Sequence, residues 1–568
     1  MEFIFQQLRN FPFIALFLSL GLGFFVGKFK VGKFVLGGIA GTLIMGVLLG
    51  QVGGIHVSND IKNMFFSLFI FMVGYLGGPQ FFASLKPSAI KYLLAAVMMT
   101  VLGLLAVLGF SIWAGLDVGL AAGLAAGGLT QSAIIGTAGD AINNLGLSVD
   151  AAKTLKTNVA VGYSITYIFG SIGPILAVGI IPIIMKWDLK KAAIALAAKM
   201  GGSGNLGEGE FTPLNRVNTR AFELNINSKF LNITIKDLEE KIGSDLTIER
   251  IIVDEKGLDP APDMILKKGN VLFVSGLVAA FAKIGNSLGN EVTEFGENVD
   301  FTEEVRSITI TNKKLNGITL KQLREKATAS QRHGVYISGL KRMSKPIPVL
   351  DGTEIHIGDE IILIGRKKDL DRAQKLIGYK SPSINTTEFV TLGIALVLGY
   401  LIGEISFKIS GTAISLGSGL GCLISGLIFG FLRTKHPKLG AINHGAASFL
   451  QSFGLAVFVG VVGLNAGQPA LQAIKEYGVT LLLLGVAVTI LPMIVQFIIN
   501  YYLFKIKEPI TALGVVTGSR SANPGFAALL EAAGNSTPTP SFTMTYAVAN
   551  IFLTLWGPVV VAIMSSIK

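Results

Sequence analysis

One arginine stands inside an otherwise apolar stretch near the end of the chain. Arg520 lies within Thr517-Gly518-Ser519-Arg520-Ser521-Ala522-Asn523-Pro524, between long runs of apolar residues. A charged side chain at membrane depth is costly and is by default a functional residue. Its planar guanidinium group suits a carboxylate, because it donates two parallel hydrogen bonds. Two interpretations stay open: Arg520 binds a substrate carboxylate, or it holds the chain locally by pairing with Glu531 or with a backbone carbonyl.

An earlier apolar stretch carries a similar polar core. Gly127-Gly128-Leu129-Thr130-Gln131-Ser132 places hydroxyl and amide side chains next to paired glycines. When the two cores are aligned on their polar residues, the neutral Gln131 is the counterpart of Arg520. These side chains either bind an anion together or bond to their own helix backbone. The candidate substrate-binding residues are Arg520, Ser519, Ser521, Asn523, Thr130, Gln131 and Ser132.

Glycine and proline in both stretches predict helices that are broken within the membrane. Broken helices expose backbone N–H groups, and the positive ends of their dipoles attract anions. We expect close backbone approach or an interrupted helix at Gly128, Gly136, Gly518, Pro524 and Gly525. Polar residues of the apolar runs that follow either face these breaks or join helices to one another. They are Asn158, Tyr163, Thr166, Tyr546 and Asn550.

The sequence lacks the residue patterns of hydrolytic enzymes, ATP-driven pumps and metal sites. Serine, histidine and aspartate form no recognisable nucleophilic triad, and no Walker motif is present. The histidines lack metal-ligand spacing, and the single cysteine, Cys422, excludes a disulfide framework and a paired-thiol metal site. The sequence therefore predicts neither an enzyme nor an ATP-driven pump, and neither a metal nor another cofactor.

Composition sets the elements that must position these residues. The 568 residues are 51% hydrophobic and only 15% charged, with a mean hydropathy of +0.61. Soluble domains carry about 25% charged residues, so the composition excludes an ordinary soluble enzyme and a disordered chain. The net charge of +12 does not indicate nucleic-acid binding, because lysine and arginine gather in the short loops between apolar runs.

Apolar runs long enough to cross a bilayer, about 20 residues each, form two groups of six. The fold class is therefore an α-helical polytopic membrane protein. The first run is followed by Lys28 without a small-residue cleavage site, so we expect it to be retained. The runs are 11–27, 34–53, 61–82, 88–115, 117–139 and 157–185, then 389–407, 411–432, 442–465, 478–504, 510–533 and 541–565.

The two groups of runs resemble each other. Each last run contains a Gly-Pro pair, Gly173-Pro174 and Gly557-Pro558, and each third run ends in a stretch that glycine and proline are expected to break, 74–80 and 463–469. With the polar cores of the fifth runs, these are three matches in the same order. Internal repetition of this kind is typical of secondary transporters. The alternative is that glycine and proline are simply frequent in membrane helices.

Positively charged loops predict the orientation of the runs. Lys28 and Lys86 mark the loops after the first and third runs as cytoplasmic, and Lys190 places the soluble middle on the same side. Both halves agree with these charges when the fifth runs, 117–139 and 510–533, dip into the membrane and return. The halves are then two inverted-topology repeats, each with about five spans and one re-entrant or broken element. Six full crossings per half, in parallel repeats, are the alternative.

A charged middle region separates the two groups and predicts two inserted α+β soluble domains. Each begins with a short strand and a helix, and continues with a strand pair, a glycine-containing turn, an apolar strand and a closing helix. The GxGxxG pattern at Gly202–Gly207 follows an alanine-rich helix rather than a strand, so we interpret it as a linker. The predicted boundaries are 1–187 for membrane repeat 1, 188–215 for the linker, 216–297 and 298–380 for the two soluble domains, and 381–568 for membrane repeat 2.

Two repeated membrane halves around a double soluble insert resemble the aspartate:alanine exchanger family. Residues 127–132 and 517–524 carry this resemblance in the membrane halves. The soluble domains resemble RCK C-terminal domains of the TrkA-C type, with Gly358-Asp359-Glu360-Ile361 as the most typical fragment. The first domain departs from that fragment with Lys268-Gly269-Asn270-Val271. The resemblance covers almost the whole chain.

The resemblance implies a multi-pass antiporter of the bacterial inner membrane with cytoplasmic soluble domains. Its substrates would be aspartate or a similar dicarboxylate, exchanged for alanine or another small anion or amino acid. Analogy with related inverted-repeat folds implies a homodimer and an elevator-like motion. Expected partners are the small-molecule substrate and membrane lipid, with no nucleic acid. The soluble domains either bind a regulatory nucleotide or serve as dimerising scaffolds.

The same soluble domains leave a second class of function open. RCK domains often regulate potassium flow, which favours an RCK-regulated cation channel or a cation/proton antiporter. Against this alternative, the sequence contains no potassium filter such as TVGYG. It also shows no buried aspartate pair of the proton-antiporter kind.

Overall fold

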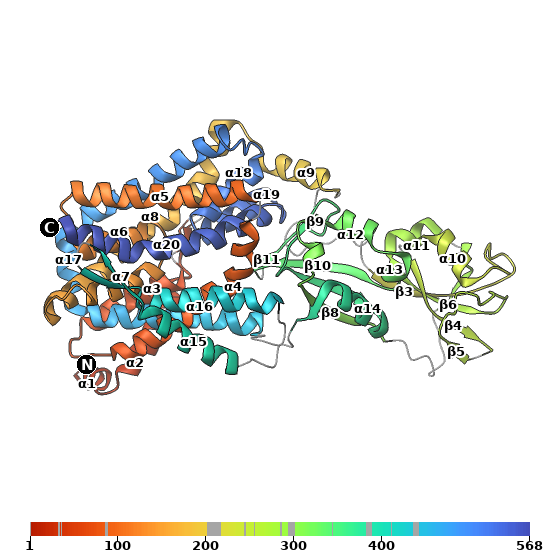
Figure 1. The fold of residues 1–568 in the computed structure, drawn as a ribbon, viewed down its shortest axis with the longest axis horizontal. Coiled ribbons are helices and arrows are strands. Elements are labelled where there is room, and N and C mark those ends of the chain that lie inside the picture. Colours follow the sequence, from red (N-terminus) through yellow and green to blue (C-terminus); the bar gives the residue numbers. More distant parts are fainter. Residues whose placement is uncertain are drawn as a thin grey trace. The chain divides into compact units, whose positions relative to one another are not determined.

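The chain divides into two compact units in the computed structural model (Figure 1). The membrane unit consists of Met1–Ala193, Pro382–Ala533 and Thr537–Lys568, and the soluble unit of Ile194–Ser381 with Gly534–Ser536. The glycine-rich pattern at Gly202–Gly207 lies outside the described residues. The structure describes residues 2–31, 34–35, 37–85, 89–201, 217–243, 246–254, 256–284, 287–292, 302–343, 345–381, 389–409, 412–435 and 442–567.

The membrane unit has a helical element for each of the twelve predicted apolar runs. The first half contains α1 (Glu2–Asn10), α2 (Pro12–Val26), β1 (Lys30–Val31), β2 (Phe34–Val35), α3 (Gly38–Gly50), α4 (Asn59–Ser84), α5 (Ile90–Trp113), α6 (Val118–Gly128), α7 (Ala133–Asn143), α8 (Val149–Met185) and α9 (Leu189–Lys199). The second half contains α15 (Phe389–Gly403), β15 (Ser406–Ile409), β16 (Thr412–Ser415), α16 (Gly417–Lys435), α17 (His444–Tyr502), α18 (Pro509–Ser519), α19 (Asn523–Ala533) and α20 (Thr539–Ile567).

Seven stretches of described helix are long and apolar enough to cross a membrane, and α1 with α2, bent by 104°, would add an eighth. Two of the seven lie in α17, which is kinked at Gly467. The predicted runs 34–53 and 389–407 are shorter in the structure, where α3 has 13 residues and α15 has 15. The described helices therefore confirm a polytopic membrane protein.

The predicted break at 74–80 is wrong, because α4 continues through Pro79 to Ser84. Its counterpart in the second half does break, since Gly467 has a φ of 40° within α17. The two third runs therefore differ, and this match between the halves does not hold at the level of the backbone.

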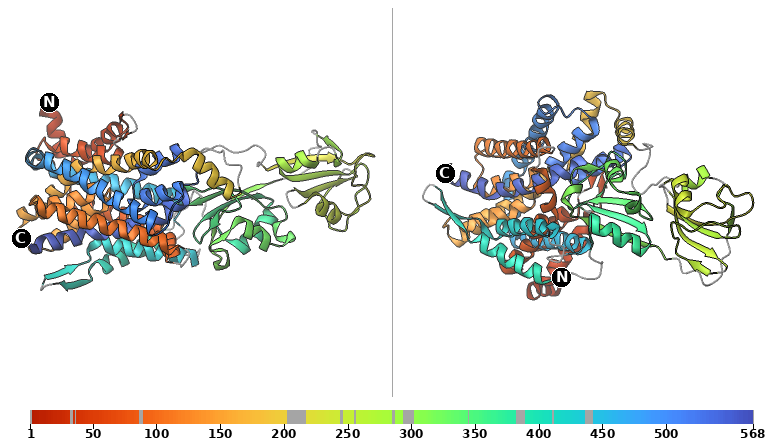
Figure 2. Two further views of the ribbon diagram at one scale, coloured as in Figure 1. Left: turned by 90° about the horizontal axis from the view of Figure 1, so that it is seen from above. Right: turned by 45° about the vertical axis from the view of Figure 1, so that its right-hand side comes forward.

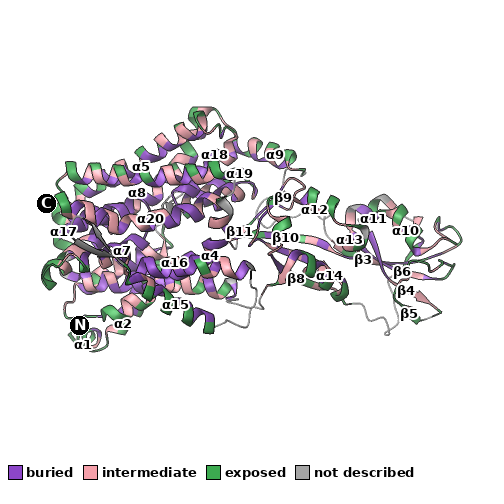
Figure 3. Cartoon of the chain, viewed as in Figure 1, coloured by how far each residue is buried: buried purple, intermediate pink, exposed green. Residues whose placement is uncertain are grey.

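Burial separates the helices into an inner and an outer set. Every residue of α6 is buried, and so are nearly all residues of α18. In contrast, α2 and α15 expose large apolar side chains such as Phe17 and Leu401, as Figure 3 shows for the outer helices. Exposed apolar helices suit contact with lipid, whereas the short polar-cored helices are enclosed by protein.

Helices α6 and α7 form a hairpin that packs against α8, and we call them the first hairpin. At its start, Asn158 Nδ2 of α8 donates to Asp117 Oδ2, directly before α6, at 2.7 Å. At its end, Asp140 of α7 attracts Lys156 of α8. Both ends therefore lie beside the first turns of α8, which agrees with the re-entrant interpretation of run 117–139.

Helices α18 and α19 form the second hairpin, which packs against α20. Gly514 of α18 contacts Ser541 near the start of α20. Phe526 of α19 stacks on Phe542, the residue after Ser541 on α20, with ring centroids 3.9 Å apart. Glu508 caps α18 through its carboxylate, as Asp117 caps α6. This hairpin therefore also returns to the side on which it starts.

The long helices α8 and α20 run in opposite directions between the two hairpins. After the first hairpin, α8 reaches the second, where its Pro174 contacts Gly525. After the second hairpin, α20 reaches the first, where its Asn550 accepts a hydrogen bond from Gln131. Inverted repeats, and their orientation across a membrane, stay a prediction.

The soluble unit contains two modules with the same strand order (Figures 1 and 2). The sheets are ordered β5-β4-β6-β3-β7 and β11-β10-β13-β8-β14. The first module contains β3 (Val217–Glu223), α10 (Ile235–Ile242), β4 (Leu246–Val253), β5 (Lys256–Leu258), β6 (Val271–Leu277), α11 (Val278–Ile284) and β7 (Asn290–Val292). The second contains β8 (Glu304–Ile310), η3 (Lys313–Leu315), β9 (Ile318–Thr319), α12 (Leu320–Lys326), α13 (Ala329–Arg332), β10 (Tyr336–Arg342), β11 (Lys345–Pro346), β12 (Glu354–Ile355), β13 (Glu360–Gly365), α14 (Lys367–Ile377) and β14 (Gly378–Lys380).

The turn before the central apolar strand is conserved between the modules in structure but not in charge. In the first module, Asn270 Oδ1 accepts from Lys267 N at 2.8 Å. In the second, Asp359 Oδ2 accepts from His356 N at 2.8 Å and also pairs with buried Arg342 at 2.7 Å. An amide therefore replaces the carboxylate at the turn itself, where only an acceptor is needed.

Candidate functional site

The tips of the two hairpins are built on the same backbone motif. In each, the two residues after the helix cap donate hydrogen bonds back to the last turn, which is a Schellman motif. The bonds are Thr130 N to Gly127 O (2.9 Å) and Gln131 N to Ala126 O (2.8 Å) after α6, and Ser521 N to Gly518 O (2.9 Å) and Ala522 N to Thr517 O (3.0 Å) after α18.

Both motifs place a side chain where glycine is normal. Thr130 has a φ of 54° and Ser521 a φ of 51°, so both are left-handed. Such a conformation costs a non-glycine residue about 1–3 kcal/mol and is concentrated at functional sites. Two equivalent residues therefore hold the same strained conformation where the tips meet.

The shared motif corrects the alignment of the two polar cores. Thr130 and Ser521 occupy the same position of the motif. Arg520 therefore corresponds to Leu129, and the prediction that Gln131 is its counterpart is wrong by two residues. The prediction aligned polar side chains, whereas the backbone turn determines equivalence. The arginine thus has an apolar residue at the matching position of the first hairpin.

Arg520 is fully buried where the two tips meet, with 0% of its surface exposed. Its Nη2 donates to Gly128 O, and Thr130 Oγ1 donates to Arg520 O at 3.0 Å. Thr489 Oγ1 of α17 also donates to Gly128 O, at 2.9 Å. The backbone-carbonyl partner considered from the sequence is therefore present. In the described part of the chain Arg520 makes no ion pair with Glu531, which is exposed.

Several polar atoms around Arg520 are buried without a partner among the described residues. They include Nε and Nη1 of Arg520 itself, and the hydroxyl groups of Ser519 and Ser521. An unsatisfied buried donor is costly, and more so when it is charged. Nε–H lies beside Nη2, and Nη1 lies on the other side of the guanidinium group, so the two free nitrogens need separate acceptors, such as the two carboxylates of one substrate.

Gln131 and Ser132 connect the first tip to neighbouring long helices. Gln131 Nε2 donates to Asn550 O at 3.0 Å and to Asn550 Oδ1 at 3.2 Å on α20. Ser132 Oγ lies 2.7 Å from Tyr163 OH on α8. The structure thus brings Asn550 and Tyr163 to the tips, as the sequence suggests. Their hydrogen bonds also fit the alternative, in which they join helices.

Asn523 and Pro524 begin α19 rather than interrupting it. Asn523 Nδ2 donates to Tyr546 OH of α20 at 3.3 Å. Pro524 lies in the first turn of α19, where a missing N–H is tolerated. The run is interrupted just before Pro524, between Ser519 and Asn523, as expected, and Pro524 itself is accommodated in the first turn of α19.

Two of the polar residues expected to face the breaks make no hydrogen bond to the tips, although Thr166 packs against Gly127 of the first tip. Asn158 bonds Asp117 at the opposite end of the first hairpin. Thr166 Oγ1 donates to Gly162 O of its own helix at 2.7 Å, which is the backbone interpretation. Sequence spacing could not separate these residues from Tyr163, because all three lie on the same apolar run.

The remaining glycines allow close packing of the hairpins. A side chain at Gly518 would meet Phe542 and Thr545 of α20, and one at Gly525 would meet Pro174 of α8. Gly136 packs against Phe66 of α4, one turn beyond the first tip. Gly518 and Gly525 therefore allow close packing around the second tip, whereas Gly136 allows α7 to pack closely against α4.

Sequence reasoning missed a set of charged residues near the base of the first hairpin. Lys62 of α4, Lys156 of α8 and Asp140 of α7 line one cavity with Lys153 and Asp150. The signal was present, because lysines within or at the start of apolar spans are costly and rare. Among the described residues, no group of three or more His, Cys, Asp or Glu side chains could hold a metal ion.

Comparison with known families identifies both parts of the chain. The Asp-Al_Ex family, described as a predicted permease membrane region, matches residues 15–183 and 391–562. The TrkA-C domain matches residues 305–378, which is the second soluble module. The first module shares the strand order of the second. No solved structure is significantly similar to this chain.

Relatives align along the whole chain. A transporter from Francisella tularensis is 44% identical, with 100% of this chain and 99% of the relative covered. A transporter from Zymomonas mobilis is 39% identical over 99% of both chains. A protein of Tetragenococcus halophilus named aspartate/alanine antiporter is 30% identical over 98% of both chains. The chain is a multi-pass membrane protein that belongs to the Asp-Al_Ex permease family and carries a TrkA-C domain.

Proposed function

We propose that this protein is a secondary antiporter that exchanges aspartate or a similar dicarboxylate for alanine or another small amino acid or anion. The single observation that carries the proposal is Arg520. It is fully buried at the meeting point of two helix breaks, with two guanidinium nitrogens unpartnered among the described residues. The relative named aspartate/alanine antiporter supports the choice of substrates.

In this proposal one substrate carboxylate accepts from Nε of Arg520, and a second carboxylate or another acceptor of the substrate accepts from Nη1. The unpartnered hydroxyl groups of Ser519 and Ser521 donate to the same carboxylate or to a second one. Asn523, Thr130, Gln131 and Ser132 complete the site from the two tips. The N-terminal ends of α7 and α19 point positive dipole ends toward it.

The proposed mechanism is alternating access with an elevator-like motion. A loaded site carries a neutralised arginine, whereas an empty site carries a buried charge without its carboxylate partner. Moving the empty site through the apolar surroundings is therefore unfavourable. This difference makes exchange, rather than one-way transport, the expected behaviour.

The proposal includes the setting of the protein. It lies in the bacterial inner membrane as a homodimer, with the soluble modules in the cytoplasm. The TrkA-C domain supports regulation by a small ligand such as a nucleotide. The alternative function, a cation channel or cation/proton antiporter controlled by these modules, has the same domain in its favour, but the membrane region belongs to a permease family.

Counterflow with purified protein in proteoliposomes tests the proposal. Vesicles loaded with unlabelled aspartate are diluted, and entry of labelled aspartate is followed, with alanine, succinate and rubidium in parallel. Arg520→Lys keeps the charge but loses the planar guanidinium group, whose separate donors the substrate uses in this proposal. Because a hydrogen bond to a charged group contributes about 1.5–3 kcal/mol, we expect KM for aspartate to rise at least about tenfold.

Arg9→Lys is the matched control, because Arg9 is exposed in the membrane unit. It should exchange like the unchanged protein. Normal exchange by a folded Arg520→Lys variant would remove Arg520 from the site. Rubidium entry without any anion exchange would favour the cation alternative.

A further inference from the structure

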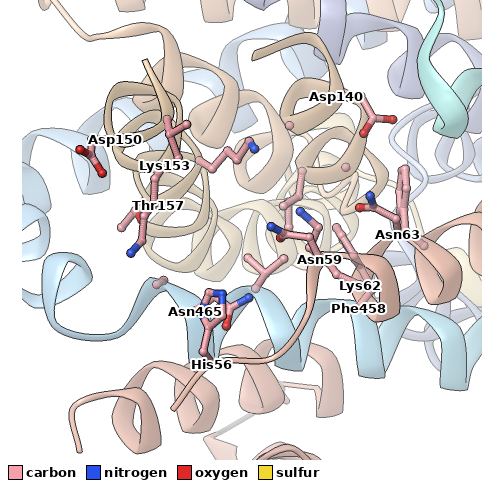
Figure 4. A pocket seen from close by; sticks show the side chains of 18 residues that line it. His56, Asn59, Lys62, Asn63, Asp140, Asp150, Lys153, Thr157, Phe458 and Asn465 are labelled. Atoms are coloured by element: carbon pink, nitrogen blue, oxygen red, sulfur yellow. The ribbon is translucent and has the colours of Figure 1, made fainter. Parts of the chain in front are cut away.

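A cavity of about 360 Å³ opens between α4, α7, α8 and α17, and Arg520 is not among its lining residues (Figure 4). Asn59, Lys62 and Asn63 lie on one side of it, and Asp150, Lys153 and Thr157 lie on the other. Its volume falls within the range of small-molecule sites. The positive-inside distribution of the loops predicts that this end of α4 faces outward.

The cavity lining carries a small excess of positive charge. Lys62, Lys153 and Lys156 line it with only two carboxylates, Asp140 and Asp150. None of the three lysines forms an ion pair with another residue in the described part of the chain.

Two of these lysines come from different helices. Lys62 of α4 and Lys156 of α8 repel each other, and Asp140 attracts both. The carboxylate of Asp140 is itself engaged, because its Oδ2 accepts from Ser418 Oγ at 3.1 Å and from Gly419 N at 3.3 Å on α16. Two partly buried lysines that share one engaged carboxylate are an arrangement that attracts an anion.

We propose that this cavity is a second, outer binding site in which Lys62 and Lys156 each hold one carboxylate of a small dicarboxylate. Asp140 weakens the site, since it lowers the positive potential at both lysines. Dicarboxylates are favoured over monocarboxylates, because a single carboxylate leaves one lysine without a partner. The binding itself is independent of Arg520.

The position of the cavity connects this site to the first hairpin. Ile135 and Gly136 line it, and they follow Ser132 of the tip by about one helical turn. Phe66 and Phe458, with ring centroids 4.8 Å apart, form part of its apolar lining. The outer site would thus concentrate substrate next to the hairpin, and this loading role rests on the proposed exchange.

A cysteine probe can test binding directly, because the one native cysteine, Cys422, is fully buried. Asn59→Cys places a thiol in the cavity, and Thr154→Cys places one on the exposed surface of α8 outside its lining. Both variants are labelled in proteoliposomes with a membrane-impermeant maleimide. Succinate should slow labelling of Asn59→Cys, propionate should do so poorly, and Thr154→Cys should react at the same rate throughout.

Charge variants test the roles of the lysines. In the Asn59→Cys background, Lys62→Gln or Lys156→Gln should raise the succinate concentration for half-protection at least about tenfold. Lys475→Gln is the matched control, because Lys475 is exposed and lies outside the cavity lining; it should change protection less than twofold. Asp140→Asn should lower the half-protecting concentration, because it removes the opposing charge.

Equal protection of both thiols, or unchanged half-protection after loss of Lys62 and of Lys156, would overturn the outer site. A different result would refute the exchange proposal, so the two proposals can be told apart. If Arg520→Lys alters exchange while both lysine variants retain normal succinate protection, the outer site is wrong and the exchanger stands. If the unchanged protein exchanges no anion but succinate still protects Asn59→Cys in a Lys62-dependent way, the cavity stands and the exchanger is wrong.

Discussion

Glu249, a buried carboxyl group on β4 of the first soluble module, lies close to Asp369, a carboxyl group of the second module. It lies at a β-bulge between Ile248 and Arg250 and is only 2% exposed. Asp369 of α14 lies on the other side of Gly334, and an oxygen of each carboxylate is unpartnered among the described residues. Burial first, and then the charge of Asp369, raises the pKa of Glu249 from 4.5 to about 7.

This raised pKa makes the stability of the soluble unit depend on pH. Between pH 4.5 and pH 7 the folded protein holds a proton on Glu249 that the unfolded chain releases. Stability therefore falls as the pH rises through this window, and stays low above it. The difference between about 7 and 4.5, at 1.36 kcal/mol per pKa unit, corresponds to roughly 3 kcal/mol. His333, whose pKa is raised mainly by its hydrogen bond to Glu239, changes stability in the same direction.

Glu249→Gln removes the cost of ionising this position. At pH 8 the variant should gain up to roughly 3 kcal/mol in local stability, whereas at pH 4.5 it should gain nothing. Hydrogen exchange with mass spectrometry on the full-length protein, corrected for the intrinsic pH dependence of exchange, measures this on the peptides of β4 and α14. Glu240→Gln is the matched control, because Glu240 is exposed on α10 of the same module.

Two outcomes would refute this reasoning. Equal or lower protection of β4 in Glu249→Gln at pH 8 would show that the carboxylate is accommodated without cost. A gain of the same size at pH 4.5 and pH 8 would show that the effect comes from packing and not from ionisation.

Three further predictions concern packing and strain. Arg342→Ala should destabilise the second soluble module by about 3–5 kcal/mol, because it removes the counter-charge of the buried Asp359 carboxylate. Hydrogen exchange measures this loss. In the control Arg324→Ala, which removes an exposed ion pair, the loss should be under about 1 kcal/mol. Gly123→Ala should lower stability by about 1–3 kcal/mol, since the added Cβ would lie 2.6–3.0 Å from the backbone of α8. The control Gly109→Ala, which has open space around it, should be neutral or slightly stabilising. Thr130→Gly should relieve the left-handed strain but lose the bond between the hairpins, so counterflow should fall while the melting temperature changes little. An unchanged exchange rate would deny Thr130 a role in joining the tips.

Some features of this protein follow from the sequence by itself, because they depend on local pattern. Apolar runs and their flanking charges predict a multi-pass membrane protein, since each span must be apolar over its own length. The alternating elements of the middle region predict two α+β modules, and these modules are observed with the same strand order. A buried arginine between small polar residues at a helix break was also visible in residues 517–524.

Other features were decided only by tertiary structure, because they depend on which residues distant segments bring together. The backbone turn, and not the polar pattern, pairs Arg520 with Leu129. Asn158 bonds at the base of the first hairpin rather than at its tip, since position along α8 is set by packing. The cavity lined by Lys62 and Lys156 joins four helices from both halves of the chain. The two lysines lie 94 residues apart in the sequence, and only folding brings them to one cavity.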